Sequence, residues 1–247
     1  MSRSLSLLFA IVCYAVFFAT FLYLIAFVGD LPVPKTVDEP QSSLAPIAAA
    51  AADVALIALF GMQHSVMARP AFKKAWTRVV SPAIERSVYV LCASIALLIL
   101  FWFWQPIDTT VWLVPANMPW LNYIIWAFFF GGFGIVLIST FLINHFELFG
   151  LQQALLNMRG AQVEAPELRQ PFFYRWVAHP LYAGFFLAFW ATPHMTLGHL
   201  VLSVALSIYM LIAIRYEEHD LEDLFGEDYR RYRASVGMLV PRFRRSN

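Results

Sequence analysis

The sequence contains few charged residues. Asp, Glu, Lys and Arg together make up 13% of its 247 residues, whereas a soluble domain usually carries about 25%. Hydrophobic residues make up 60%, and the formal net charge is only +1. This composition excludes an ordinary soluble domain. It predicts an all-α integral membrane protein that lies in a lipid bilayer and has no nucleic-acid partner.

Cysteines and metal-binding patterns are also scarce. Cys13 and Cys92 both lie inside apolar runs, so we expect small buried side chains and not a disulfide or a metal pair. No two histidines are spaced i, i+4, and no Cys-x-x-Cys-His is present, so no metal site is expected. A haem site would depend on four separated histidines: His64, His145, His179 and His194.

Long apolar runs, by contrast, are abundant. Four of them have the length of a membrane span, which takes about 20 residues: 5–28, 44–62, 88–104 and 121–143. A fifth run, residues 181–214, is too long for one span, and Pro193, His194 and Gly198 interrupt it near its middle. We expect this run to form a helical hairpin with a short first arm. The sequence therefore predicts five to six transmembrane helices, the last of them in a C-terminal hairpin followed by a tail.

Small residues mark two of these predicted spans. Ala45 and the alanines at 48–52 predict that the second span lies in the interior of the bundle, because small side chains let helices approach closely. Gly131, Gly132 and Gly134 predict a close helix contact or a bend in the fourth span.

The basic residues predict how the chain crosses the membrane. If the N-terminus is cytoplasmic and six spans alternate, all 17 Lys and Arg residues except Lys35 fall on the cytoplasmic side. The positive-inside rule therefore predicts that both termini are cytoplasmic.

Polar groups gather at the predicted cytoplasmic ends of the spans. Such groups are costly in or beside a bilayer unless they have a partner or a function. They are Gln63, His64, Asn144, His145, Glu147, Gln152, His179, Glu217 and Glu218. We expect them to form one polar pocket. The alternative is that each merely marks the membrane–water interface.

Two motifs in the last third of the chain resemble a known family. They are His179-Pro180-Leu181-Tyr182-Ala183-Gly184 and Arg215-x-Glu217-Glu218, the latter followed by Phe225-Gly226-x-x-Tyr229-x-x-Tyr232 and Val240-Pro241. These motifs resemble the isoprenylcysteine carboxyl methyltransferase-like family of integral-membrane enzymes, which use S-adenosylmethionine. The stretches around Gln63-His64 and Asn144-His145 are similar to a narrower branch, which contains the bacterial methanethiol S-methyltransferases and the NnrU-type membrane proteins.

This resemblance implies a division of the chain and a cofactor site. Residues 1–120 are expected to form an NnrU-like three-helix membrane region, and residues 121–247 a methyltransferase core whose hairpin and cytoplasmic tail hold the cofactor. The motif positions imply these cofactor-binding residues: His179, Pro180, Leu181, Tyr182, Gly184, Arg215, Glu217 and Glu218. Relatives usually carry Arg before His-Pro, where this chain has Ala178, so Arg175 is the candidate to supply that guanidinium.

The resemblance also implies the reaction: S-adenosylmethionine-dependent methylation of a small volatile thiol, methanethiol giving dimethyl sulfide, in a bacterial cytoplasmic membrane. Because the thiolate is the nucleophile, a base or a positive electrostatic field would help the reaction. His145 and His64 are the candidates, with Asn144 beside His145, and Gln63, Glu147 and Gln152 are the substrate candidates. Two alternatives remain, namely a methyltransferase for isoprenylcysteine or lipid, and a non-enzymatic NnrU-like protein linked to haem or nitrogen oxides.

Overall fold

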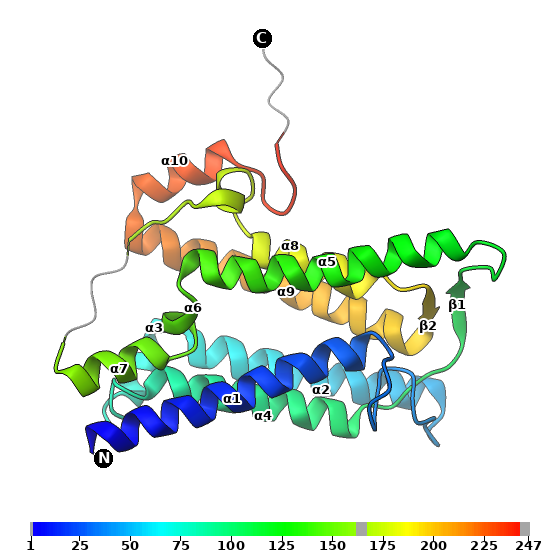
Figure 1. Ribbon diagram of the computed structural model, residues 1–247, viewed down its shortest axis with the longest axis horizontal. Coiled ribbons are helices and arrows are strands. Elements are labelled where there is room, and N and C mark those ends of the chain that lie inside the picture. The colour runs from blue at the N-terminus through cyan, green and yellow to red at the C-terminus, as the bar shows by residue number, and fades with distance from the viewer. Residues whose placement is uncertain (1, 162–166, 243–247) are drawn as a thin grey trace, which may run out of the picture. The chain divides into compact units, whose positions relative to one another are not determined.

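The computed structural model describes residues 2–161 and 167–242, and most of them are helical (Figure 1). The helices are α1 (Arg3–Val28), α2 (Pro46–Ala68), α3 (Pro70–Trp76), α4 (Glu85–Phe103), α5 (Pro119–Ile143), α6 (His145–Leu148), α7 (Leu151–Arg159), the 3-10 helix η1 (Phe172–Arg175), α8 (Pro180–Trp190), α9 (Leu197–Phe225) and α10 (Glu227–Ser235). Two short strands, β1 (Thr110–Leu113) and β2 (His194–Thr196), pair antiparallel. The predicted all-α class is confirmed.

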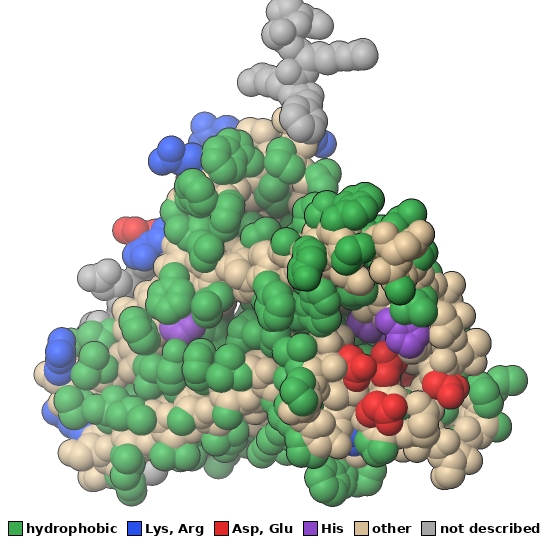
Figure 2. Space-filling model, turned by 45° about the vertical axis from the view of Figure 1, so that its right-hand side comes forward, with side chains coloured by type: hydrophobic (Ala, Val, Ile, Leu, Met, Phe, Trp, Pro, Cys, Tyr) green, Lys and Arg blue, Asp and Glu red, His purple; other side chains and the backbone are tan. Residues whose placement is uncertain are grey.

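Five of the described helices are long and apolar enough to cross a membrane: α1, α2, α4, α5 and α9. Figure 2 shows hydrophobic side chains over much of the visible face, as expected of a surface that meets lipid. The sixth apolar helix, α8, has only 11 residues, so it rises about 16 Å, roughly half of a hydrocarbon core. The short first arm of the predicted hairpin is therefore a half-length helix.

Two helices continue beyond their predicted ends. Helix α2 runs to Ala68 and so includes Gln63 and His64, which lie beyond the predicted end of the second span at residue 62. Helix α9 runs through the polar stretch 215–220 to Phe225. The apolar pattern stops where a span reaches water, but neither stretch contains a proline or glycine that would end the helix.

The elements form two compact units that interleave in the sequence. Unit 1 contains α1 to α4, β1, α6, α7, β2 and residues 197–205 of α9. Unit 2 contains α5, η1, α8, residues 206–225 of α9, and α10. Within unit 1, α4 packs against both α1 and α2, and within unit 2, α5 packs along α8. The predicted division at residue 120, between a three-helix membrane region and a methyltransferase core, stays a prediction.

The prediction that α2 lies in the interior is wrong. Of the five long apolar helices, α2 is the least buried, and Ala48 and Ala51 are exposed. Only one narrow stripe, spaced i, i+4, is buried: Ala49, Asp53, Ile57 and Gly61. Small residues allow a close contact but do not specify that one forms on every side of a helix.

The prediction of a close contact at the glycines of α5 is confirmed at one of them. A Cβ atom added at Gly132 would lie 2.6 Å from the carbonyl oxygen of Gly184 on α8 and 2.7 Å from the backbone nitrogen of Ala188. Around Gly131, by contrast, no atom lies within 4 Å of such a Cβ. Helices α5 and α8 therefore touch backbone to backbone at the Gly132–Gly184 crossing.

This crossing predicts opposite results for two neighbouring substitutions. Gly132→Ala should lower the free energy of unfolding by about 1–3 kcal/mol, because the added methyl group forces the two backbones apart. Gly131→Ala is the matched control and should be neutral or slightly stabilising, since its methyl group meets open space. Thermal unfolding of the detergent-purified variants measures both. Equal stability of the two variants would contradict the close contact.

The loop between α1 and α2 is fastened to the start of α9 within unit 1. The Thr196 hydroxyl donates to a carboxylate oxygen of Asp38 at 2.5 Å and accepts the backbone N–H of His199 at 3.0 Å. Burial raises the pKa of Asp38 from 3.8 to about 6, and the Thr196 hydrogen bond only partly offsets this effect. Three further groups act on Asp38 more weakly: Asp30, His194 and Glu39.

Asp38 should make stability depend on pH. Because its folded pKa is above its unfolded value, protonated Asp38 contributes stability that is complete below about pH 3.8 and is lost as the pH rises through about 6. Asp38→Asn, which cannot ionise, should therefore gain in unfolding temperature relative to the native protein between pH 4 and pH 7. Two parallel curves over this range would show that Asp38 is not buried as a neutral group.

Candidate functional site

In unit 2, the loop before α8 is held by the segment after α10. The backbone N–H of Ala178 donates to the carbonyl of Gly237 at 2.8 Å, and that of His179 donates to the carbonyl of Met238 at 3.1 Å. The N–H of Gly237 returns a bond of 3.1 Å to the carbonyl of Trp176. The backbone of His179 is thus fixed by residues almost 60 positions later in the chain.

A small hydrophobic cluster lies beneath this pairing. Ala178 is buried in it together with Tyr229, Tyr232 and Val236. A long arginine side chain at position 178 would not fit in this cluster without moving its members. Arg175, the predicted substitute, has an exposed side chain in η1.

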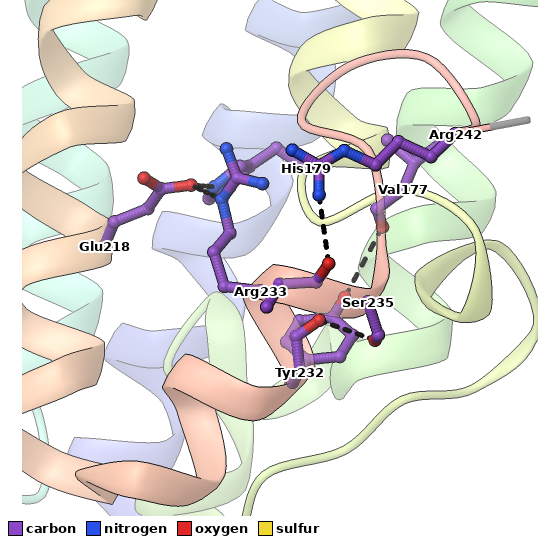
Figure 3. Close-up of polar contacts among 8 residues, drawn as sticks. Val177, His179, Glu218, Tyr232, Arg233, Ser235 and Arg242 are labelled. Carbon is purple, nitrogen blue, oxygen red and sulfur yellow. Dashed lines mark hydrogen bonds and ion pairs between the residues drawn. The ribbon is translucent and has the colours of Figure 1, made fainter. Parts of the chain in front are cut away.

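The two polar ends of the predicted hairpin meet in unit 2. The Nε2 atom of His179, at the start of α8, lies 3.0 Å from a carboxylate oxygen of Glu218 on α9. The same oxygen accepts a hydrogen bond from the guanidinium of Arg233 on α10 (Figure 3). Glu218 thereby connects three helices, and the guanidinium beside the His-Pro motif comes from Arg233.

Glu217 has different surroundings from Glu218. Its half-buried carboxylate makes no ion pair with any described residue. The pKa of Tyr229 is raised by burial first and then by the nearby charges of Glu218 and Glu217. Glu217 similarly raises the pKa of buried Tyr174, after burial itself. Of these two carboxylates, Glu218 alone has an ion pair within the described residues.

Most of the remaining predicted cofactor residues lie along the first turns of α8. Pro180 is the first residue of α8 and is buried, and Leu181 is half-buried. The ring of Tyr182 meets the imidazole of His179 edge to face, with centroids 5.8 Å apart. Gly184 faces α5 and is accounted for by helix packing. Arg215 is exposed on α9.

In unit 1, the buried imidazole of His145 is surrounded by aromatic side chains. Its side of α6 faces α1, where the Tyr14 hydroxyl lies 2.8 Å from the imidazole Nε2. The ring of Phe149 lies 4.9 Å from the imidazole centroid. Burial lowers the pKa of His145 below its usual 6.5, so the imidazole is neutral at pH 7 and can accept a proton.

His64 has an equivalent tyrosine partner within unit 1. The Tyr89 hydroxyl of α4 lies 2.9 Å from Nε2 of His64. The guanidinium of Arg86 lies 4.9 Å from the centroid of the Tyr89 ring, and its Nε donates to the carbonyl of Leu148 at 2.8 Å. These contacts therefore join α2, α4 and α6 within unit 1.

The other predicted groups serve several local contacts. The Gln63 amide donates to the sulfur of Met67 at 3.1 Å, while its buried oxygen has no partner among the described residues. The carbonyl of Glu147 accepts the side-chain amide of Gln153 at 3.1 Å, and Gln152 is half-buried on α7. Asn144 ends α5 in unit 2. The roles of these four residues, and the single common pocket, stay predictions.

Sequence reasoning missed Arg233 and the tyrosine partners of the two histidines. Tyr14 is 131 positions from His145 in the sequence. Tyr14 and Tyr89 both lie inside apolar runs, where nothing in the sequence distinguishes them from other residues of a membrane span. Arg233 stands in an arginine-rich segment that fits a solvated tail equally well. Only the fold brings these residues to their partners.

Comparison with known proteins places the chain in a family. A family model described as "NnrU protein" matches residues 54–240. The chain belongs to the NnrU family. It also resembles curated proteins over nearly its entire length, and no solved structure matches it.

Three of these relatives share a name. The Methanethiol S-methyltransferase of Mycobacterium tuberculosis is 47% identical over 98% of this chain and 98% of that protein. The Methanethiol S-methyltransferase of Pseudomonas deceptionensis is 48% identical over 89% of this chain and 82% of its own length. Methanethiol S-methyltransferase 1 of Bradyrhizobium diazoefficiens is 47% identical over 99% of this chain and 84% of its own.

Proposed function

We propose that this chain is an S-adenosylmethionine-dependent thiol S-methyltransferase that converts methanethiol to dimethyl sulfide in the membrane. The observation that carries the proposal is the near-full-length similarity, at 47% identity, to a relative named Methanethiol S-methyltransferase. The name agrees with the reaction expected from the sequence motifs. The buried polar networks of both units supply the kinds of group that this reaction needs.

The groups of unit 2 fit the methyl donor. Glu217 has no ion pair among the described residues and suits an ammonium or a hydroxyl of the donor. The face of Tyr182 suits a sulfonium cation, and the buried Tyr229 hydroxyl lacks a partner within the described residues. When bound, S-adenosylmethionine supplies a methyl group on a sulfonium, which is an activated leaving group. The remaining task of unit 2 is to orient this group and exclude water.

The groups of unit 1 fit a proton acceptor for the thiol. Thiolate is the reactive form, while a free thiol has a pKa of about 8.5 or above. His145 is neutral because burial lowers its pKa, and Tyr14 orients its ring. We assign proton removal to His145, with His64 and its partner Tyr89 as the second candidate.

The five long apolar helices indicate an integral membrane protein. We extend this to a bacterial cytoplasmic membrane with both termini in the cytoplasm, because Lys35 is the only basic residue predicted on the outer side. A lipid environment also suits a small volatile thiol and its thioether product.

Methyl transfer from isotopically labelled S-adenosylmethionine tests the proposal directly. The detergent-purified protein is incubated with methanethiol, with longer thiols and with a farnesylated cysteine. Label in volatile dimethyl sulfide is the expected result. Label only in the prenylated acceptor would establish the isoprenylcysteine alternative, and a Soret band without methyl transfer would establish the haem-linked one.

A further inference from the structure

Arg86, in the first turn of α4, carries a half-buried guanidinium that forms no ion pair with any described residue. Glu85, the acid beside it in the chain, pairs with Lys73 at 3.6 Å. Arg233 shows the usual arrangement, since it is also half-buried and bonds to the carboxylate of Glu218. A charge that is partly removed from water is normally paired, so the charge of Arg86 calls for an anion.

The contacts of Arg86 hold the guanidinium in place without using its terminal nitrogens. Its Nε donates to the carbonyl of Leu148 at 2.8 Å, and its central carbon lies 4.9 Å from the centroid of the Tyr89 ring. The backbone beside Leu148 is packed closely on α4, because a Cβ atom added at Gly150 would lie 2.5 Å from the Ser87 hydroxyl oxygen. The terminal nitrogens carry the remaining N–H donors of the guanidinium. Within the described part of the chain they meet no acceptor, so they can bind a ligand.

The same contacts connect Arg86 to both candidate proton acceptors of unit 1. Tyr89, whose ring lies under the guanidinium, has its hydroxyl 2.9 Å from Nε2 of His64. Leu148 is the last residue of α6, the four-residue helix that begins at His145. Arg86 therefore contacts the tyrosine partner of one histidine and the helix of the other. A thiol beside a guanidinium ionises more readily, because the positive charge stabilises the thiolate.

We propose that Arg86 is the anion site for the thiol substrate, and that its terminal nitrogens donate to the thiolate sulfur. This inference rests on the proposed function, because it takes the thiol from that reaction. The thiol proton passes to an imidazole of unit 1, and Arg86 stays protonated and pairs with the thiolate. The thiolate lone pair then forms the bond to the methyl carbon, while the bond from that carbon to the donor sulfur breaks.

Two inhibitors of methyl transfer, one charged and one neutral, test the anion site in a neutral detergent without lipid phosphate. Thiocyanate is a small sulfur anion and should compete with methanethiol. Arg86→Gln should weaken inhibition by thiocyanate about 10- to 100-fold, the effect of a lost charge-assisted hydrogen bond. Inhibition by dimethyl sulfide, which is uncharged, should not change in Arg86→Gln. Equal losses for both inhibitors, or no loss for thiocyanate, would overturn the inference.

Arg86→Lys separates the charge of Arg86 from its structural contacts. It keeps a positive charge but loses the Nε bond to Leu148, so thiocyanate inhibition should stay within about threefold of the native value. If Arg86 only holds α6, Arg86→Lys would instead lose as much as Arg86→Gln, which would overturn the inference. Arg78→Gln changes an exposed arginine before α4 and is the matched control that should behave like the native protein.

Binding of S-adenosylhomocysteine distinguishes failure of this inference from failure of the proposed function. Its affinity should not change in Arg86→Gln, because Arg86 belongs to unit 1 and the cofactor candidates to unit 2. If the native protein forms no dimethyl sulfide and does not bind S-adenosylhomocysteine, the proposed function is wrong, and this inference with it. If the native protein is active and thiocyanate inhibits Arg86→Gln equally well, only this inference is wrong.

Discussion

His145→Ala should lower turnover about 10²- to 10⁴-fold, the range expected when a general base is removed, while S-adenosylhomocysteine still binds. The prediction follows from the neutral, buried imidazole held by Tyr14 in unit 1. The cofactor candidates His179, Glu217 and Glu218 all belong to unit 2. Binding of S-adenosylhomocysteine should therefore not change in His145→Ala, and measuring it is the control for correct folding of unit 2. His145→Gln fills more of the buried space and should show the same loss, which separates chemistry from packing.

The pH dependence of turnover identifies the base more specifically. Because the pKa of His145 is lowered, native activity should stay level down to pH values below 6.5 before it declines. In His145→Ala only thiol that is already ionised reacts, so the rate should keep climbing as the pH rises past about 8.5, the pKa of a cysteine thiol, toward the higher pKa of an alkanethiol. Tyr14→Phe keeps the ring but loses the orienting hydroxyl, so we expect a smaller loss of turnover and an unchanged pH profile.

His219→Ala changes an exposed histidine and is the control that should keep full activity. A His145→Ala profile identical to that of the native enzyme would exclude His145 as the base.

Glu218→Gln should damage both the fold of unit 2 and the binding of the methyl donor. The amide keeps the shape of the carboxylate but leaves the half-buried Arg233 charge without its counter-charge and weakens the bond to His179. Breaking one side of such a charge-assisted pair costs about 2–3 kcal/mol in the free energy of unfolding. Affinity for S-adenosylhomocysteine should fall at least about tenfold, because the start of α8 and the last turn of α10 lose their common anchor.

A neighbouring glutamate provides the control for this substitution. Glu222→Gln lies one turn further along α9 and loses only an exposed pair, 3.7 Å from Arg230, which is worth about 0–1 kcal/mol. The double variant Glu218→Gln/Arg233→Gln should be much less destabilised than the sum of its two single variants, since both remove the same interaction. Strictly additive losses would show that Glu218 and Arg233 act independently.

The sequence predicts the membrane architecture well, because spans are fixed by local apolar content. Helices α1, α4 and α5 lie within a few residues of their predicted bounds. The ends of α2 and α9 were misplaced, because hydropathy reports where a helix leaves lipid and not where its hydrogen bonds stop. The interior position expected for α2 failed for a related reason, since alanine is equally compatible with lipid and with a neighbouring helix.

The candidate site was predictable in its residue types and only partly in its contacts. The interruption near the middle of the run 181–214 was enough to predict a hairpin, and a hairpin brings His179 to the Glu217-Glu218 pair. Which of the two glutamates binds His179 depends on helical phase, and the choice of Arg233 over Arg175 depends on how α10 folds back. Such contacts arise from packing between distant segments, and no local pattern in the sequence encodes them.

The pairing of residues 177–179 with residues 237–238 also has a consequence for biosynthesis. The apolar helices can enter the membrane one after another during translation, but His179 is fixed only after residue 238 has left the ribosome. A chain that stops after α9 would therefore be inserted in the bilayer yet lack the closed loop before α8. We expect premature termination or proteolysis near residue 236 to leave membrane-embedded protein without the closed loop before α8, so the amount in the membrane would overstate the amount of correctly folded protein.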